Sequence, residues 1–289
     1  EAIIEEKDAN HEQRKIEEVN SGILAIKSNS LKKLLPELKN KNAAKEYYLT
    51  DIVGLAKDSG IKVKALLLEN PDEVMGANTR LELQELERTC QKNQAKKLVE
   101  SGIQVADILR LDIRGSLEAG RGTFIDVNNV FEGKVVLGRG VTIGPNCYIK
   151  DSTIDNGAIL KANTVIEDSN VGFGCTVGPF ARLRGGTELE DLSELGNFVE
   201  ANRSKIGKAT KAKHLTYLGD ALLGAEVNIG AGTITCNFDG EKKHKTKLAD
   251  KVFVGSNTSL VAPVSLGKKS YTGAGSVITK NVPAGDLAV

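Results

Sequence analysis

Residues 137–166 read LGRGVTIGPNCYIKDSTIDNGAILKANTVI, and an aliphatic residue returns in this stretch at nearly every sixth position. The positions of this repeat are Leu137, Ile143, Ile149, Ile154, Leu160, Ile166, Val171, Val177, Leu183, Leu189, Leu195, Leu260, Leu266, Thr272, Ile278 and Ala284. A glycine, aspartate or other small or polar residue usually follows the repeat position. A hexapeptide period held this long is typical of a parallel β-helix, in which each hexad forms a strand and a turn and about 18 residues complete one coil.

The repeat is interrupted in two ways. Its interval shortens to five between residues 149 and 154, 166 and 171, and 218 and 223. We interpret each short interval as a deletion at a coil corner, which keeps the repeat residue pointing inward. The period breaks between Thr235 and Leu248, so residues 236–247 are predicted to form a polar loop outside the helix. A β-sandwich of alternating strands is the competing fold, but it would not hold a six-residue phase.

Composition sets the limits within which a function can be sought. A chain of 289 residues suits two domains, and a net charge of +1 gives no argument for binding nucleic acid or an anionic membrane. No apolar run approaches the roughly 18 to 20 residues of a membrane span, and no signal peptide is visible.

Four cysteines occur, and none of them forms a CxxC pair. Cys147 and Cys175 fall on the small core position of the repeat, Cys90 lies in a charged helix, and Cys236 lies in the polar loop. We expect reduced, structural thiols rather than disulfides or a zinc site.

The start of the sequence leads to a separate expectation. Residue 1 is glutamate and the only methionine is Met75. We expect the chain to begin inside a longer reading frame, or to have been cut.

Residues 1–80 differ from the repeats in their pattern of predicted secondary structure. Strands are predicted at residues 2–4 and 61–68, and a turn that enters a buried strand is predicted at residues 18–26. Helices are predicted at residues 28–40, with Ser30 as a cap, and from residue 50 to 56. The alternation predicts an α/β domain. Residues 81–99 read as a charged amphipathic helix, which we interpret as a stiff connector between domains.

Several segments are similar to one protein family, in the same order and over nearly the whole chain. They are EEKDA at 5–9, EVNSGI at 18–23, EYYLTD at 46–51, GANTR at 76–80, GPFARLR at 178–184, GNFVE at 196–200, HLTYLGD at 214–220 and NIGAGTITCNFDG at 228–240. They resemble the bacterial bifunctional N-acetylglucosamine-1-phosphate uridylyltransferase / glucosamine-1-phosphate N-acetyltransferase family. Hexads alone occur in many acyltransferases, and the last two segments are much more specific.

The resemblance implies an architecture and two activities. It implies a partial nucleotidyltransferase α/β domain at 1–80, a connector helix at 81–101 and a left-handed parallel β-helix of hexapeptide repeats at 102–289. The β-helix would acetylate glucosamine 1-phosphate from acetyl-CoA. The front domain would transfer UMP from UTP with Mg²⁺ to give UDP-N-acetylglucosamine. The family acts as a cytoplasmic homotrimer with acetyl-transfer sites between subunits.

His214 is the candidate catalytic base for acetyl transfer. An imidazole titrates near neutrality and can accept the proton of an attacking amine. A histidine packed at a coil corner is the structural alternative, and the match of HLTYLGD to the family's catalytic segment favours the catalytic role. His11, in a polar stretch, and His244, in a lysine-rich loop, are weaker candidates.

The resemblance assigns further residues to the substrates. Those matching contacts to the sugar phosphate are Arg184, Asn202, Tyr217, Asn228 and Lys243, and those matching acetyl-CoA contacts are Ala231, Asn237, Phe238, Ser256 and Ala274. Arg184 has the planar fork that suits paired phosphate oxygens. Plain structural roles compete with these assignments: a surface position for Arg184, solvation for Lys243, and the small size the coil requires for Ala231 and Ala274.

Two departures from the family bear on substrate binding. Asn202 stands where the family usually has a phosphate-binding lysine, and the adjacent Arg203 is a possible substitute. The chain also ends at Val289, before the segment that supplies the family's basic contacts to CoA, so weaker acetyl-CoA binding is expected.

In the front domain, Glu5 and Asn20 match contacts to the UDP-sugar, and Asn78 matches both such a contact and a Mg²⁺ ligand. Mg²⁺ also needs carboxylate and phosphate oxygens. The matching aspartate and the glycine-rich nucleotide loop would precede Glu1, so we expect little or no uridylyl transfer from this chain.

Different functions remain open on the residues alone. A trimeric carbonic anhydrase on the same kind of coil would need three histidines on zinc, and His11 lies outside the repeats, which leaves too few. The hexapeptide period is also compatible with a non-catalytic trimeric scaffold and with a different hexapeptide-repeat acyltransferase.

Overall fold

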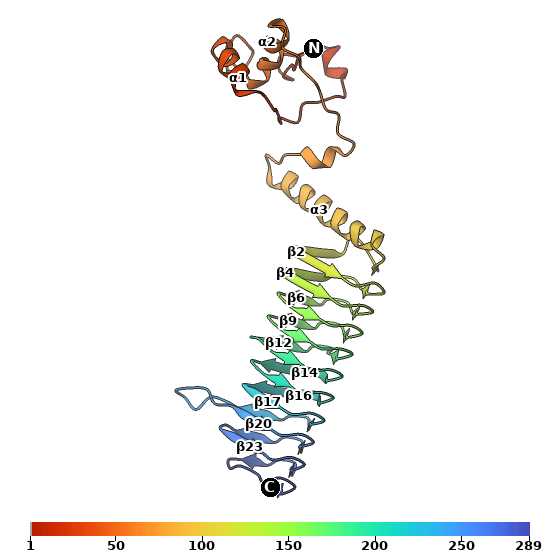
Figure 1. Cartoon of the computed structure of the whole chain (residues 1–289), viewed down its shortest axis with the longest axis vertical. Coiled ribbons are helices and arrows are strands. Elements are labelled where there is room, and N and C mark those ends of the chain that lie inside the picture. Colours follow the sequence, from red (N-terminus) through yellow and green to blue (C-terminus); the bar gives the residue numbers. More distant parts are fainter. Residues whose placement is uncertain (1) are drawn as a thin grey trace. The chain divides into compact units, whose positions relative to one another are not determined.

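The computed structural model describes residues 2–289 and separates the chain into two compact units, with the boundary along the sequence between residues 86 and 87. The second unit is a parallel β-helix of short strands stacked coil upon coil (Figure 1). This confirms the architecture predicted from the hexapeptide period.

The strands of the helix form three ladders in which every pairing between strands is parallel. The first ladder holds β1 (Gln104–Val105), β3 (Phe124–Ile125), β5 (Thr142–Ile143), β8 (Ile159–Leu160), β11 (Thr176–Val177), β14 (Glu194–Asn202), β16 (Lys211–Gly219), β18 (Asn228–Ile229), β21 (Phe253–Val254), β24 (Tyr271–Thr272) and β26 (Leu287–Ala288). The second holds β2 (Leu111–Ala119), β4 (Asn129–Leu137), β6 (Tyr148–Lys150), β9 (Val165–Glu167), β12 (Arg182–Arg184), the later halves of β14 and β16, β19 (Ile234–Cys236), β22 (Ser259–Val261) and β25 (Val277–Ile278). The third runs from the end of β4 through β7 (Thr153–Ile154), β10 (Asn170–Val171), β13 (Glu188–Leu189), β15 (Lys205–Ile206), β17 (Ala221–Leu223), β20 (Thr246–Leu248) and β23 (Val264–Leu266).

The repeat residues form one continuous core. Ile143, Ile149 and Ile154 are fully buried, which confirms that the five-residue step does not turn the repeat outward. The column also begins earlier than Leu137, because Ile125 and Phe131 are equally buried.

The predicted repeat position Ala284 is wrong. Ala284 is exposed, and Val282 takes the inward place at 7% exposure and pairs with Leu266. The last coil closes with a four-residue step from Ile278, so the six-residue count overshoots there.

Helix α3 (Arg80–Glu100) closes the first coil. A capping box begins it: the Glu82 amide donates to the Thr79 hydroxyl, and the Glu82 carboxylate accepts from the Thr79 amide. Farther along, the buried Gln91 side chain donates to the Ile113 carbonyl and accepts from its amide at 2.6 Å. The helix therefore covers strand edges that would otherwise stay open.

The first unit is built on short helices. They are α1 (Ser28–Leu34), α2 (Ile52–Asp58) and the 3₁₀ segments Gln13–Lys15, Leu35–Glu37, Leu49–Asp51 and Pro71–Val74. The predicted helix at 28–40 is shorter than expected because Pro36 ends its regular hydrogen bonding. Ser30 is not its cap, since the cap position is Lys27.

The strands predicted at 2–4, 18–26 and 61–68 do not form in residues 2–103. A strand needs a neighbouring backbone to pair with, and an isolated hairpin is marginal in water. Leu66 and Leu67 remain more than four-fifths exposed. The buried core of this unit is small, comprising Leu34, Ile52 and Ala56.

The loop predicted after Thr235 is confirmed, with narrower bounds. Strand β19 continues to Cys236 and β20 begins at Thr246, so residues 237–245 leave the helix (Figure 1). Within residues 2–289, no helix has both the length and the apolar character that crossing a membrane requires.

Candidate functional site

One corner of the β-helix, where the first ladder turns into the second, gathers several predicted site residues; we call it the first corner. Asn197 and His214 lie in register there on β14 and β16. The Gly232 amide donates to the Leu215 carbonyl at 3.0 Å, which places Ala231 beneath His214. Ser256 and Ala274 continue the column, as the Asn257 amide bonds the Ala231 carbonyl at 2.7 Å and the Gly275 amide bonds that of Ser256 at 2.8 Å.

This column brings His214 and three predicted acetyl-CoA contacts onto one edge. Neighbouring strands lie about 4.8 Å apart, so the three steps from His214 to Ala274 span about 14 Å. Because Ala231, Ser256 and Ala274 are small, the edge below His214 presents mostly backbone.

On the other side of His214, the first corner becomes bulky and apolar. Phe180, Phe198 and Leu215 occupy successive coils there, each more than half exposed. The two phenyl rings stack with centroids 5.4 Å apart. All three residues adopt positive φ, between +49° and +57°, a conformation rare for bulky side chains. We call these three residues the apolar ridge.

His214 is exposed, and its ring contacts the preceding coil. Its Nδ1 lies 2.6 Å from Oδ1 of Asn197. Both residues line a cavity of about 140 Å³ that also has Lys161, Glu194 and Lys213 in its wall. The Lys213 ammonium bonds Glu194 and holds the pKa of that carboxyl below its usual value.

Asn197 is a site residue that the sequence analysis missed. It precedes His214 by 17 residues, which is one coil that contains a five-residue step. Two signals were available: Asn197 lies within the quoted segment GNFVE, and the shortened coil brings it level with His214.

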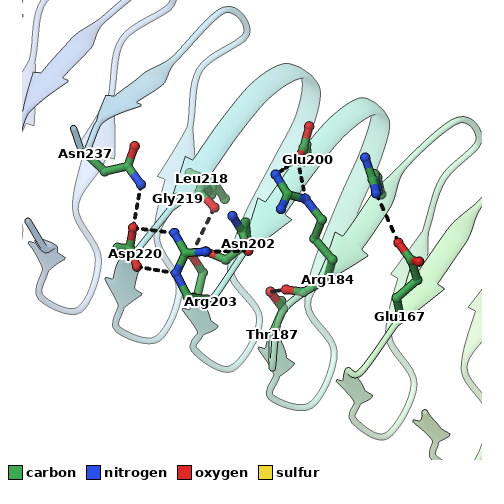
Figure 2. A network of polar contacts seen from close by, with 12 residues as sticks. Glu167, Arg184, Thr187, Glu200, Asn202, Arg203, Leu218, Gly219, Asp220 and Asn237 are labelled. Carbon is green, nitrogen blue, oxygen red and sulfur yellow. Dashed lines mark hydrogen bonds and ion pairs between the residues drawn. The ribbon is translucent and has the colours of Figure 1, made fainter. Parts of the chain in front are cut away.

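A second group of predicted residues meets at the corner where the second ladder turns into the third (Figure 2). Arg203 donates from Nε and Nη2 to the two carboxylate oxygens of Asp220, at 2.8 and 2.9 Å. Its Nη1 donates to Oδ1 of Asn202 at 3.2 Å. Asp220 also accepts from the Asn237 side-chain amide at 2.5 Å. The bond from Arg203 is the main reason that the pKa of Asp220 is lowered.

Tyr217 lies over the same network. A Cβ on Gly219 would come within 2.6 Å of both the Tyr217 hydroxyl and the Asn237 amide nitrogen. The missing side chain at Gly219 therefore leaves room for both groups beside Asp220.

The departure from the family pattern at Asn202 can be located in this network. Asn202 is only 2% exposed, so its amide faces Arg203 rather than open solvent. The guanidinium of Arg203 is itself engaged by Asp220 and Asn202. Arg184, one coil earlier on β12, donates from Nε to Oε1 of Glu200 at 2.7 Å and stays about a third exposed.

The protruding loop is organised by its own contacts. Phe238 and Lys243 pair across it, and His244 Nε2 lies 2.5 Å from Asp239. Asp239 also accepts from two backbone amides of the loop, those of Glu241 and Lys242, which with His244 lower its pKa. Asn237 ties the base of the loop to Asp220, and the loop that leaves the helix there carries Lys243 and the half-exposed Phe238.

The remaining predicted residues are more dispersed. Asn228 is half-buried on the first ladder, in register with Lys211 and Phe253. In the first unit, Glu5 accepts from the Thr50 hydroxyl at 3.0 Å, and Asn20 is exposed.

Asn78 lies just before α3, where its backbone amide donates to Glu82. No hydrogen bond joins Glu5, Asn20 and Asn78 in the part of the chain that the structure covers. Across residues 2–289, no three His, Cys, Asp or Glu side chains converge on a position that could hold a metal ion.

Comparisons with known proteins show which chains this one is similar to. The chain is 55% identical over 288 residues to the bifunctional protein GlmU of Marinobacter nauticus, and 53% identical over 287 residues to that of Idiomarina loihiensis. These alignments cover 100% and 99% of this chain but 63% of each relative, so the chain spans less than two thirds of their length. A family model described as the GMPPB C-terminal domain matches residues 114–237.

Among solved structures, LpxA, a UDP-N-acetylglucosamine acyltransferase from Bacteroides fragilis, aligns with a TM-score of 0.44 and 16% identity. That alignment covers 60% of this chain and 67% of LpxA.

Proposed function

We propose, for a chain that belongs to the bifunctional GlmU family, that its β-helix transfers an acetyl group from acetyl-CoA to the amine of glucosamine 1-phosphate. The observation that carries the proposal is the first-corner column, in which one histidine stands at the end of a straight edge of small residues. A base at the end of a narrow edge suits an extended thioester arm.

His214 would act as the general base. Its imidazole accepts a proton from the sugar amine as the nitrogen attacks the thioester carbonyl. The C–N bond forms, the C–S bond breaks, and the CoA sulfur leaves as a thiolate that takes up a proton. The exposed ring leaves the face opposite Asn197 open to substrate.

The acyl donor would lie along Ala231, Ser256 and Ala274. The span of about 14 Å leaves room for an extended arm, and backbone groups on the edge offer hydrogen bonds. Asn237 and Phe238, at the base of the loop, would contact the donor from the side.

Glucosamine 1-phosphate would bind between the first corner and the Arg203–Asp220 network. Arg184 would contact the phosphate, with Tyr217, Asn228 and the loop residue Lys243 around the sugar. Because Asn202 is buried against Arg203, we expect its contribution to be indirect, through the position of that guanidinium.

A homotrimer would complete the site. The apolar ridge of Phe180, Phe198 and Leu215 is adjacent to His214 and half exposed in the single chain. A second copy packed there would remove these side chains from water, which stabilises an interface.

For the second activity that the resemblance implies, uridylyl transfer, we propose that Glu5 and Asn20 contact a UDP-sugar. Asn78 would offer Mg²⁺ one amide oxygen, and Mg²⁺ requires further oxygen ligands. The nearby Glu82 carboxylate is already used by two backbone amides. We therefore derive no metal-dependent step from these residues.

The test is thiol release from acetyl-CoA by the purified chain, with glucosamine 1-phosphate compared with N-acetylglucosamine 1-phosphate as acceptor. Turnover with the free amine alone is expected, because the acetylated nitrogen has no lone pair available for attack. Equal thiol release with both acceptors would reject amine acetylation, and release with neither would favour a non-catalytic β-helix.

A further inference from the structure

We infer that Asn197 is a positioning residue, which fixes the proton of His214 on Nδ1 and leaves Nε2 free to act as the base. The inference rests on the proposed acetyl transfer, but its central observable, the position of one proton, can be measured without substrate.

The geometry selects one tautomer. The contact joins Nδ1 of His214 to the side-chain oxygen of Asn197, at 2.6 Å. An amide oxygen only accepts hydrogen bonds, so Nδ1 must donate. In the neutral ring the other nitrogen, Nε2, then carries the lone pair.

The backbone places the two residues side by side on neighbouring strands. Asn197 and His214 are in register on β14 and β16, and each precedes a residue with left-handed backbone, Phe198 at φ +57° and Leu215 at +49°. Both backbone segments therefore turn immediately after Asn197 and His214.

Gly196 allows the close approach that precedes the turn. A Cβ at this residue would lie 1.9 Å from the Lys213 carbonyl oxygen. On the other side of the pair, the Thr216 hydroxyl donates to the His214 carbonyl at 2.8 Å. These contacts confine the backbone on both sides of the imidazole.

The charged neighbours of the ring do not replace Asn197. Lys161, Glu194 and Lys213 line the same cavity. Glu194 is engaged by both Lys211 and Lys213, so its carboxylate is already paired. In the described chain, the group that hydrogen-bonds the His214 ring is the neutral amide of Asn197.

The experiment measures the tautomer of His214 by ¹⁵N NMR and, separately, the kinetics of acetyl transfer. In the parent chain the neutral ring is expected to carry its proton on Nδ1. In Asn197→Leu the proton is expected to move to Nε2, with kcat lower by about 10- to 100-fold, by analogy with the loss seen when the partner that orients a metal-binding histidine is removed. KM for both substrates should stay within about twofold.

Two further variants separate positioning from folding. Asn197→Asp keeps an acceptor oxygen, so it should keep the Nδ1 proton and move the acid limb of the pH–rate profile upward by about one unit, as a nearby negative charge favours the protonated ring. Asn170→Leu, the same change at an exposed strand position of the third ladder, should leave the tautomer and kcat unchanged.

A parent chain with the proton on Nε2 would overturn the inference, as would Asn197→Leu with unchanged tautomer and unchanged kcat. If the parent shows the Nδ1 proton but no acetyl transfer, the proposed function fails while the positioning contact stands.

Discussion

Arg203 holds both carboxylate oxygens of Asp220, at 2.8 and 2.9 Å, and Asp220 in turn holds the side chain of Asn237 at 2.5 Å. This relationship joins three successive coils and anchors the loop at residues 237–245 (Figure 2). The Asp220 side chain is only 13% exposed, so its charge depends on these partners.

Arg203→Met should therefore loosen the loop. Loss of a partner from a largely buried hydrogen-bonded group costs about 1 to 3 kcal/mol. We expect faster hydrogen exchange of the loop amides and a higher KM for glucosamine 1-phosphate. Arg182→Met, which breaks the half-exposed Arg182–Glu167 pair, is the control and should cost less than about 1 kcal/mol. Equal effects from the two variants would contradict the anchoring role.

The Arg203–Asp220 pair also predicts a pH dependence of stability. Arg203 lowers the pKa of Asp220, so the pair stabilises the fold above the unfolded value, which is near 3.9 for aspartate. This stabilisation is lost as pH falls through the lower folded value. The difference in unfolding free energy between the parent and Arg203→Met should thus be constant above pH about 5 and shrink below pH about 4. A difference that grows on acidification would contradict this sign.

Close packing at Gly196 predicts a steric cost. Gly196→Ala should lower the unfolding free energy by about 1 to 3 kcal/mol and reduce kcat, because the added Cβ meets the Lys213 carbonyl. Gly140→Asn is the control: nothing lies within 4 Å of a Cβ there, and asparagine already adopts φ +59° at Asn128, Asn146 and Asn163. Its cost should be within about 0.5 kcal/mol. Thermal unfolding of both variants measures the two costs, and an equal loss of stability would contradict a steric cost specific to Gly196.

The apolar ridge predicts the assembly state. Phe198→Asp should convert a trimer of the parent chain into monomers, because a charge would be buried in the interface. Aspartate also tolerates the positive φ of this position better than phenylalanine does. Phe173→Asp is the control: Phe173 is 51% exposed and lies between β10 and β11, at a different corner. Molar mass by light scattering tests both, and a monomeric parent would refute the assembly.

Cysteine burial predicts selective reactivity. Burial raises the pKa of the Cys147 and Cys175 thiols to about 11, which leaves about one thiolate in a thousand at pH 8. Iodoacetamide should therefore modify the exposed Cys90 and spare this pair while the chain is folded. Mass spectrometry of peptides after brief labelling, with a urea-unfolded sample as control, measures the difference. Rapid labelling of Cys175 would show that the coil opens there.

Much of the β-helix was predictable because its core residues are set by a local period. The five-residue steps also determine which residues meet: Asn197 and His214, and likewise Arg203 and Asp220, are separated by 17 residues. A constant coil length of 18 residues would therefore predict neither contact.

Three features escaped the sequence analysis for physical reasons. The exposed segment at 61–68 has strand-forming residues but no partner backbone among the described residues. The repeat overshoots at Ala284 because the final coil shortens. The residues of the apolar ridge lie inside segments that resemble the family, but propensity does not signal a phenylalanine or leucine at positive φ, so their alignment at one corner was not predicted.

The central claim is that His214 removes the proton of the sugar amine. Its most direct test is the rate of thiol release from acetyl-CoA with glucosamine 1-phosphate in the parent chain and in His214→Ala. We predict a loss of about 10² to 10⁴ in kcat, the usual contribution of a general base, with the fold intact by circular dichroism. Unchanged turnover in His214→Ala would remove this residue from the mechanism and contradict the account.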